Sequence, residues 1–254
     1  MDKREFEGKV ALVTGAGSGM GRLASVCLAE QGACVMALDV NMDTANETVA
    51  QAAARGGEAT AMYCDVRRYE DICAARDKAI EKYGHIDICI SFAGGFPARM
   101  LKDNAPGKTF KDWKVETLDW GVEVNFRAPL YMAHAVIGHM MERKTGVLIQ
   151  IGSIDGQTGS GAIDYSAEKS GLMNGLTKSL ALYGAPYGVR ANCVTPGPVM
   201  TRPAMANMHT LLGRAAEPQE VVDLVLYLCS DKAAFITGAN YMIDGGRQCG
   251  AIEK

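Results

Sequence analysis

The sequence predicts an α/β fold, a single domain built on a doubly wound parallel sheet of the Rossmann type with helices on both faces. Short, β-branched and nearly continuous apolar runs alternate with segments of helical periodicity along residues 1–254. A glycine-rich turn directly follows the first of these runs, and no Pro/Ser-rich linker or internal repeat breaks the alternation. Apolar strands that alternate with amphipathic helices are typical of βαβ units, whose parallel sheet is covered on both sides.

The predicted elements follow from these runs in chain order. Strands are expected at 9–15, 33–40, 59–66, 86–94, 146–153, 189–197 and 239–243. Helices are expected at 19–31, 43–55, 68–83, 117–143, 163–184 and 217–230. In such a sheet, ligands bind beyond the carboxyl ends of the strands, where the strand order reverses. The functional residues should therefore gather at those ends.

Composition narrows the classes of function. Apolar residues make up 48% and charged residues 22% of the chain, as in an ordinary globular protein. The net charge of −3 offers no basic surface for nucleic acid or anionic lipid. No run approaches the roughly 18 apolar residues of a membrane span, and the charged start "MDKREFEGK" lacks the apolar segment of a signal peptide. We expect a cytoplasmic protein.

The cysteines and histidines predict no metal site. The eight cysteines form neither a CxxC motif nor a Cys/His cluster, and most lie inside apolar runs, where a cysteine behaves as a small buried hydrophobe. The four histidines are interpreted as structural, with a substrate contact as the alternative for the last of them; they are His85, His134, His139 and His209.

The turn "TGAGSGMG" opens the first predicted helix. Its glycines Gly15, Gly19 and Gly21 lack the Cβ atoms that would keep backbone amides away from a pyrophosphate, and the helix dipole favours that negative charge. In this strand–turn–helix context the turn predicts a dinucleotide site.

Asp39 predicts which dinucleotide binds. It ends the second predicted strand, 18 residues after Gly21, where a carboxylate accepts hydrogen bonds from both adenosine ribose hydroxyls. The 2′-phosphate of NADP would meet like charge there, and neither Ser18 nor Val40 is basic. The sequence therefore predicts NAD as the cofactor.

Tyr165 and Lys169 stand four residues apart at the start of a predicted helix, in "DYSAEKSG". That spacing places them one above the other on a single helix face. Such a pair can be surface decoration, or the cation can acidify the phenol. A free phenol is only about 0.1% ionised at pH 7, and a neighbouring cation favours the phenolate. The second interpretation makes Tyr165 a general acid/base.

Together these motifs resemble the short-chain dehydrogenase/reductase family, and the resemblance covers essentially the whole chain. The family's T-G-x-x-x-G-x-G, Y-x-x-x-K and P-G motifs match here, in the family's order along the chain. The resemblance implies catalytic roles for Asn125, Ser153, Tyr165 and Lys169, with Ser153 binding the substrate oxygen and Asn125 holding a water beside Lys169. It implies a cofactor site made of Gly15, Ser18, Gly19, Met20, Gly21, Asp39, Val40, Asp65, Val66, Phe92, Ala93, Gly94, Tyr165, Lys169, Pro196, Gly197, Val199 and Thr201.

The chain departs from the family pattern around the expected substrate site. Residues 91–94 read "SFAG" instead of N-N-A-G, so Phe92 is expected to fill space by packing. Positions 153–165 are one residue closer than usual, which predicts a tightened loop. The connection 94–125 is longer than usual, and the segment 201–213, a mobile lid in the family, is short.

These departures predict where substrate selectivity lies. The polar candidates are Asp155 and Gln157, and the apolar ones are Phe96 and Met200, joined by Met100 and Met205. They suggest a mostly apolar pocket for a steroid or another alicyclic alcohol, although a polyol or sugar acid remains an alternative.

Three functions compete at this stage. The leading one is an NAD(H)-dependent dehydrogenase or reductase of a secondary alcohol or ketone. The second is a reductase of carrier-bound 3-oxoacyl groups, against which Asp39 and the negative net charge argue. The third is a non-catalytic NAD sensor or scaffold, which has no need of a low-pKa phenol. The partners expected are a small-molecule substrate and, from apolar surface on the helices 117–143 and 163–184, further copies of the chain in a homotetramer.

Overall fold

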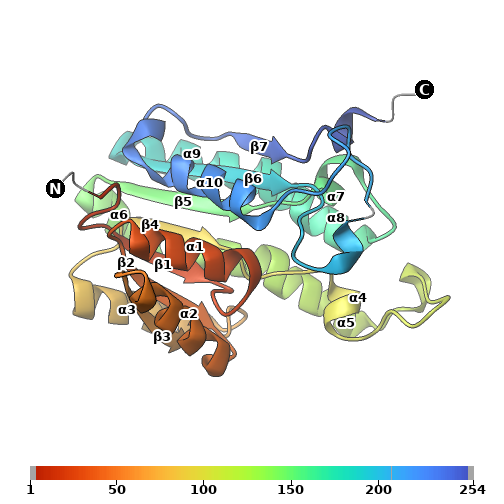
Figure 1. Ribbon diagram of the computed structural model, residues 1–254, viewed down its shortest axis with the longest axis horizontal. Helices are drawn as coiled ribbons and strands as arrows, with labels where there is room; N and C mark the ends of the chain where they lie inside the picture. Colours follow the sequence, from red (N-terminus) through yellow and green to blue (C-terminus); the bar gives the residue numbers. More distant parts are fainter. Residues whose placement is uncertain (1–3, 207, 251–254) are drawn as a thin grey trace.

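Seven parallel strands form one sheet in the order β3-β2-β1-β4-β5-β6-β7 (Figure 1). This computed structural model describes residues 4–206 and 208–250. The strands are β1 (Val10–Thr14), β2 (Cys34–Asp39), β3 (Glu58–Tyr63), β4 (Ile88–Ser91), β5 (Gly146–Ile151), β6 (Val189–Pro196) and β7 (Asn240–Ile243). The predicted doubly wound parallel sheet is confirmed.

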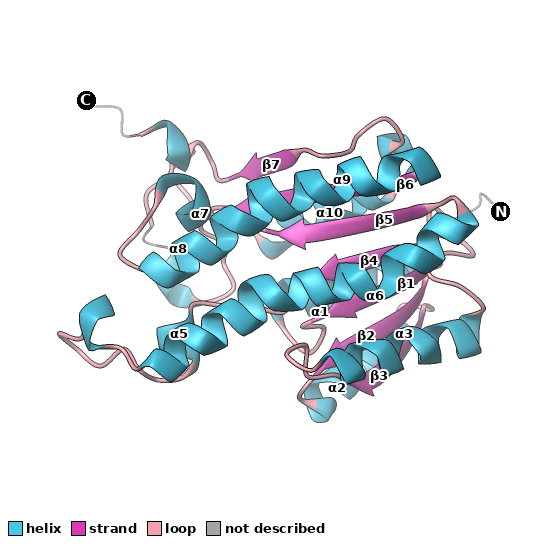
Figure 2. Cartoon of the chain, turned by 180° about the vertical axis from the view of Figure 1, so that it is seen from behind, coloured by secondary structure: helices cyan, strands magenta, loops and turns pink. Residues whose placement is uncertain are grey.

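Helices cover both faces of the sheet. One face carries α1 (Gly19–Glu30), α2 (Met42–Ala54) and α10 (Pro218–Cys229), which lie in front of the strands in Figure 1. The other face carries α3 (Tyr69–Tyr83), α6 (Ala128–Arg143) and α9 (Thr177–Gly184), seen in Figure 2. Within residues 4–206 and 208–250, no helix has the length and apolar character needed to cross a membrane.

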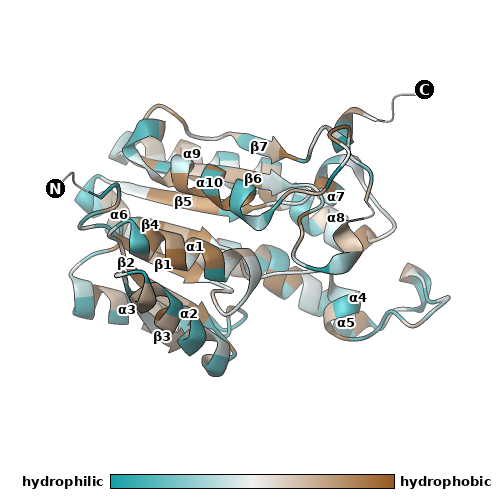
Figure 3. Cartoon of the chain, in the orientation of Figure 1, coloured by the Kyte–Doolittle hydropathy of each residue, from teal (hydrophilic) through white to brown (hydrophobic). Residues whose placement is uncertain are grey.

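The core lies in two layers because side chains alternate across each strand. In β1, Val13 packs into the layer under α1 and α10, whereas Leu12 packs into the layer under α3 and α6. Both side chains are fully buried. Figure 3 shows the central strands as the most hydrophobic part of the molecule. Strands buried on both faces explain why the sequence shows apolar runs instead of an alternating pattern.

The two long predicted helices are composite. α5 (Val115–Gly121), the π-helical turn η2 (Val122–Arg127) and α6 follow one another without a break. α8 (Ile163–Ser170), the π-helical turn η3 (Gly171–Leu176) and α9 do the same. The two composite helices run side by side in Figure 2. Single π-helical turns often occur at functional sites, and η2 contains Asn125.

The structure corrects three local predictions at the carboxyl edge of the sheet. β4 ends at Ser91, well before residue 94, because the chain turns away where the Ala93 N–H donates to Thr14 Oγ1 over 3.2 Å. The loop 153–165 contains the helix α7 (Ile154–Thr158). The connection 95–116 contains α4 (Pro97–Met100) and the short 3-10 helix η1 (Phe110–Asp112), which extend beyond the sheet in Figure 1.

Short 3-10 turns complete the structure. They are η4 (Ala185–Tyr187), η5 (Pro203–Met205), η6 (Asp231–Ala233) and η7 (Arg247–Cys249). Of these, η5 lies in the segment 201–213 and borders the site described next.

Candidate functional site

Two cavities open at the carboxyl ends of the strands, where the strand order reverses between β1 and β4. The first, of about 380 Å³, lies over the glycine turn and the end of β2. The second, of about 500 Å³, lies over the ends of β5 and β6. They share Met20, Phe92 and Gly94 as a common wall. A third hollow of about 550 Å³ lies at the opposite end of the strands and gathers none of the predicted site residues.

The glycine turn leaves no room for Cβ atoms. A Cβ on Gly15, whose φ is +66°, would lie 2.8 Å from the Ala93 nitrogen. A Cβ on Gly21 would lie 2.2 Å from the Gly15 oxygen. The N-cap residue of α1, Ser18, makes no side-chain capping bond, so the first N–H groups of the helix stay available to an anion. The turn therefore fits the pyrophosphate of a dinucleotide.

Asp39 is held at the end of β2 by two backbone N–H groups. Its Oδ2 accepts a hydrogen bond of 2.8 Å from Gly17, and its Oδ1 accepts one of 2.9 Å from Asn41. A Cβ on Gly17 would lie 2.8 Å from the Asp39 Cγ, so this glycine is required for the carboxylate's position. Gly17 was not among the predicted site residues, although it lies inside the same glycine motif.

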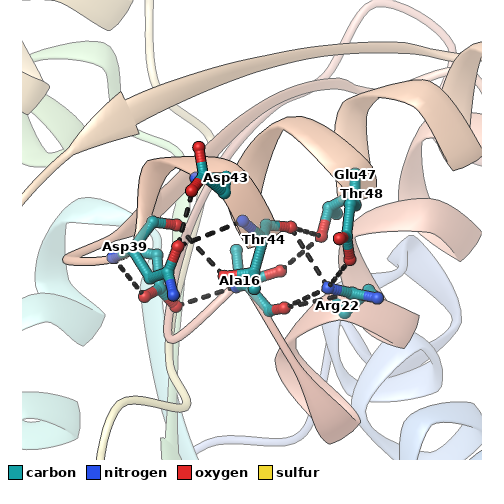
Figure 4. A network of polar contacts seen from close by, with 9 residues as sticks. Ala16, Arg22, Asp39, Asp43, Thr44, Glu47 and Thr48 are labelled. Atoms are coloured by element: carbon teal, nitrogen blue, oxygen red, sulfur yellow. Dashed lines mark hydrogen bonds and ion pairs between the residues drawn. The ribbon is translucent and has the colours of Figure 1, made fainter.

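The nearby cation Arg22 is turned away from Asp39 (Figure 4). Its Nη2 donates to the Gly17 and Thr44 carbonyls over 2.5 and 3.2 Å and to Glu47 over 2.8 Å. These bonds commit the guanidinium to the α1–α2 contact. Arg22 is absent from the cavity wall, where Ser18, Asp39 and Val40 are found.

Asp65 and Val66 line the far wall of the first cavity. Arg67 forms an ion pair of 2.5 Å with Asp65, and its hydrogen bonds lower the pKa of that carboxyl. Arg67 lines the same cavity, but Asp65 binds its Nε and Nη2 together. Arg67, like Arg22, is therefore already paired with a carboxylate.

Tyr165 and Lys169 both lie in α8 and both line the second cavity. The Lys169 Nζ donates a 2.8 Å hydrogen bond to the Ile151 carbonyl at the end of β5 and lies 5.8 Å from the centre of the Tyr165 ring. Burial lowers the pKa of Lys169 to about 8. The helix face predicted from the spacing therefore points into the site.

Tyr165 is buried, and its phenol favours the neutral form. Burial raises its pKa to about 12, the Asp155 and Glu168 charges act in the same direction, and a hydrogen bond with Ser153 opposes them. The desolvation of the buried ring outweighs the nearby Lys169 cation. The phenolate therefore needs a further positive charge, such as the nicotinamide ring of the expected cofactor.

Ser153 is placed by a helix that the sequence did not predict. It is the N-cap of α7, and its Oγ accepts a hydrogen bond of 3.3 Å from the Asp155 N–H. Asp155 also lines the second cavity, and burial raises the pKa of its carboxyl. The segment between Ser153 and Tyr165 therefore begins with a helical turn.

Asn125 is fully bonded to protein groups. Its Nδ2 donates to the Gly95 carbonyl over 3.0 Å and to Glu168 over 2.8 Å, and its Oδ1 accepts from the Gly95 N–H over 2.8 Å. Both amide hydrogens are thus used within the protein, and Asn125 ties the 92–95 turn to α8. The water that Asn125 is expected to hold beside Lys169 stays a prediction.

Glu168 was missed by the sequence analysis. Its side chain is only 6% exposed, and one carboxyl oxygen, Oε1, has no hydrogen-bond partner among the described residues. Burial, and to a smaller extent the Asp164 charge, raises its pKa to about 7 against the hydrogen bond from Asn125. The available signal was an acidic residue directly before Lys169 in "YSAEK".

The second cavity combines apolar and charged side chains. Of the six substrate candidates, Phe96, Asp155 and Met205 line it, whereas Met200 and the exposed Gln157 do not. Met100 lines the first cavity instead. Gln157 lies in α7 with its side chain exposed. The Met200 N–H donates a hydrogen bond to the carbonyl of residue 216. The prediction of a mostly apolar pocket missed two arginines, Arg99 and Arg202.

The remaining predicted cofactor residues also border these cavities. Ala93 lies in the wall of the first, and the residues after β6 lie in the wall of the second, namely Pro196, Gly197, Val199 and Thr201. A Cβ on Gly197 would lie 2.7 Å from the Asp244 Cα, which explains the glycine of the P-G turn.

The histidines lie away from the two cavities. His134 bonds to Tyr69 over 2.6 Å, His85 to Asp87 over 2.9 Å, and His139 accepts from the Ile86 N–H over 3.3 Å. His209 is exposed and lines neither cavity. Residues 4–206 and 208–250 contain no cluster of three His, Cys, Asp or Glu side chains suited to a metal ion.

Comparison with known proteins places this geometry in context. A family model described as Enoyl-(Acyl carrier protein) reductase matches residues 15–248. Cyclohexanol dehydrogenase of Acinetobacter sp. is 33% identical over 95% of each chain. Trans-4-hydroxycyclohexanecarboxylate dehydrogenase of Sinomonas cyclohexanicum is 37% identical over 95% of this chain and 93% of its own. A short-chain type dehydrogenase/reductase structure from Mycobacterium marinum superposes with a TM-score of 0.87, at 29% identity over 98% of both chains.

The raised pKa of Glu168 predicts a pH-dependent stability. The folded state holds the Glu168 proton up to about pH 7, whereas an ordinary glutamate loses it near 4.5. The folded state therefore binds more protons, and this residue lowers stability as pH rises between those values. Glu168→Gln keeps an acceptor for Asn125 and cannot ionise. We expect the free energy of unfolding of Glu168→Gln, relative to that of the unaltered protein, to rise by about 2 kcal/mol from pH 4.5 to pH 8.

Urea unfolding of both proteins at the two pH values and one protein concentration measures this difference. Glu142→Gln, at a surface glutamate for which no such change is expected, is the control. The same stability gap at pH 4.5 and pH 8 for Glu168→Gln would contradict the assignment.

Proposed function

Because the chain belongs to the short-chain dehydrogenase/reductase family, whose dehydrogenases generally use nicotinamide cofactors, we propose that it is an NAD(H)-dependent oxidoreductase of secondary alcohols and ketones. One observation carries the proposal. Tyr165 and Lys169 line a cavity with Ser153, and that cavity shares Met20, Phe92 and Gly94 with the one over the glycine turn. A hydride donor and a carbinol carbon can therefore meet at this wall.

The substrate class that we propose is an alicyclic secondary alcohol. The cavity of about 500 Å³ has room for a ring, and apolar side chains make up much of its wall, including Phe96, Ile154, Met205 and Met208. The relatives named for cyclohexanol and for hydroxycyclohexanecarboxylate act on ring alcohols. A steroid nucleus is a larger candidate of the same kind.

In the proposed reaction, Tyr165 Oη exchanges the hydroxyl proton of the substrate. Ser153, which lines the same cavity as Tyr165, holds the substrate oxygen and stabilises the charge that develops there. Lys169 is fixed by the Ile151 carbonyl and contributes positive charge near the ring. NAD⁺, when bound, would supply the hydride acceptor and the further positive charge that Tyr165 needs.

Cofactor preference in this proposal depends on Asp39. Its carboxylate is fixed by two N–H groups and suits a pair of ribose hydroxyls. Arg22 and Arg67, the cations nearest this end of the site, are already paired with Glu47 and Asp65. A 2′-phosphate would therefore meet an uncompensated negative charge.

The function is tested first with a panel of ketones. We expect NADH absorbance to fall with cyclohexanone and related alicyclic ketones, and NAD⁺ to be reduced with the corresponding alcohols. A protein that binds NADH yet turns over no alcohol or ketone would contradict the enzymatic function and favour the sensor interpretation.

The cofactor preference predicts the effect of a double substitution. We expect the unaltered enzyme to prefer NAD(H) strongly, and Asp39→Ala with Val40→Arg to narrow or reverse that preference, because the repulsion is removed and a cation is added at an exposed position of the cavity wall. Steady-state kcat/KM with both cofactors measures it. Equal kcat/KM for the two cofactors in the unaltered enzyme would refute the role of Asp39.

Removal of the Tyr165 hydroxyl should abolish turnover. We expect Tyr165→Phe to lose at least about 10³-fold in kcat, or roughly 4 kcal/mol of barrier, with NADH affinity nearly unchanged. Lys169→Met should lose activity and also weaken NADH. With cofactor bound, alcohol oxidation should rise with pH at an apparent pKa well below 10.

Rates and NADH binding are measured on the same preparations. If Tyr165→Phe keeps more than about a tenth of the rate, the base lies elsewhere, and Asp155, in the same cavity, is the first alternative.

We also propose that the chain assembles as a homotetramer. The composite helices leave large apolar side chains exposed, among them Val115 at 66%, Leu182 at 79% and Tyr183 at 61%. Such surface is typically covered by another subunit. Light scattering at micromolar concentration should give the mass of four chains, with a dimer as the second expectation. A monomer under these conditions would refute the proposal.

A further inference from the structure

The second cavity contains two arginines that the proposed reaction does not use. Arg99 lies in α4, and Arg202 directly precedes η5. Both line the same cavity as Tyr165. They come from segments 100 residues apart, so only the fold brings them together.

Arg99 lies close to the reacting groups. Its Nη2 is 3.8 Å from where a Cβ on Gly95 would stand, and the backbone of Gly95 holds Asn125. Phe96, the N-cap residue of the helix that carries Arg99, packs against the Tyr165 ring with a centroid distance of 6.4 Å, and all three residues line the cavity. An anionic group bound to Arg99 and a hydroxyl bound to Tyr165 can therefore belong to the same small molecule.

The positive charge of this pair is not compensated by the protein. The Arg99 Nε is buried without a hydrogen-bond partner in the described chain, and its Nη2 meets only the Met100 sulfur, at 3.9 Å. Burial and the Arg202 charge both lower the pKa of Arg99. Neither arginine takes part in an ion pair among residues 4–206 and 208–250.

The carboxylate in the same cavity does not fill this role. Asp155 lines the wall, but the cation that acts on it is Arg247. Arg99 and Arg202 are half-buried, and the Arg99 Nε is shielded from solvent. A shielded cationic group without a partner is costly. The cost is offset if a ligand brings the missing negative charge.

We infer that the substrate carries a carboxylate, which Arg99 and Arg202 bind while Tyr165 and Ser153 hold the ring hydroxyl. This inference rests on the proposed function and narrows its substrate class to hydroxycycloalkane carboxylates. The planar guanidinium fork matches the two oxygens of a carboxylate. A phosphate would be better served by free helix N–H groups, yet α4 is a single short turn that begins with Pro97, which has no N–H to donate.

Binding is tested with a compound that cannot react. Cyclohexanecarboxylate lacks the hydroxyl and keeps the acid, and its methyl ester keeps the ring without the charge. Each is titrated calorimetrically into the full-length protein in the presence of NADH. We expect the acid to bind at least about tenfold more tightly than the ester, since charge-assisted hydrogen bonds to a carboxylate are strong.

Matched variants assign that difference to the two arginines. Arg99→Met and Arg202→Met should each weaken binding of the acid by about 10- to 100-fold and bring its affinity close to that of the ester. Arg99→Lys, which keeps the charge without the fork, should fall between. Arg55→Met is the control, because Arg55 pairs with Glu30 at the surface of α2, away from the cavity. Thermal unfolding of each variant checks that it folds.

The outcomes separate this inference from the proposed function. Equal affinity for acid and ester, or an equal loss in Arg55→Met, overturns the carboxylate site, and cyclohexanol oxidation with NAD⁺ then shows that the function stands without it. If acid binding depends on Arg99 but the protein oxidises no ring alcohol, the carboxylate site is supported and the proposed function is rejected. Cyclohexyl phosphate is the competing anion, and tighter binding of it than of the acid overturns the choice of carboxylate.

In turnover, 4-hydroxycyclohexanecarboxylate is compared with cyclohexanol. We expect kcat/KM to favour the acid by about 30-fold in the unaltered enzyme, and that ratio to collapse toward one in Arg99→Met and Arg202→Met. A ratio that stays near 30 in both variants overturns the role of the arginines.

Discussion

The site depends on one constraint, which is that two backbone turns approach each other closely. These turns follow β1 and β4, where the strand order reverses. β1 and β4 pair side by side, and the turns that follow them meet where a Gly15 Cβ would lie 2.8 Å from the Ala93 nitrogen. Only glycine permits this contact, because any side chain there would force the turns apart. The contact closes the wall that the nucleotide cavity and the second cavity share.

From this wall, a chain of buried polar contacts reaches the helix that carries the reactive side chains. The 92–95 turn continues into Gly95, whose N–H and carbonyl hold Asn125, and Asn125 in turn donates to Glu168 beside Lys169. Asn125 lies in the π-helical turn that joins α5 to α6. Buried hydrogen bonds of this kind rigidify their surroundings. The sheet edge, the helix α8 and the second cavity are therefore positioned together.

Burial moves the titratable groups of this region toward their neutral forms. It raises the pKa of Tyr165 to about 12 and of Glu168 to about 7, and it lowers that of Lys169 to about 8. A site in which desolvation outweighs local charge responds strongly to any charge that a ligand brings, because little water screens it. Such a cavity suits both the cationic cofactor ring and the anionic substrate group that we propose.

The sequence by itself determined the parallel sheet, the glycine turn after β1 and the common helix face of Tyr165 and Lys169, since each depends on local chemistry at a fixed spacing. Apolar runs, glycines and an i,i+4 pair predict the same local structure whatever the rest of the chain does. The protonation of Tyr165, the partners of Asn125 and the places of Arg99 and Arg202 were decided only by the tertiary structure. Burial and the meeting of segments 100 residues apart are properties of packing, and no local pattern in a single sequence encodes them.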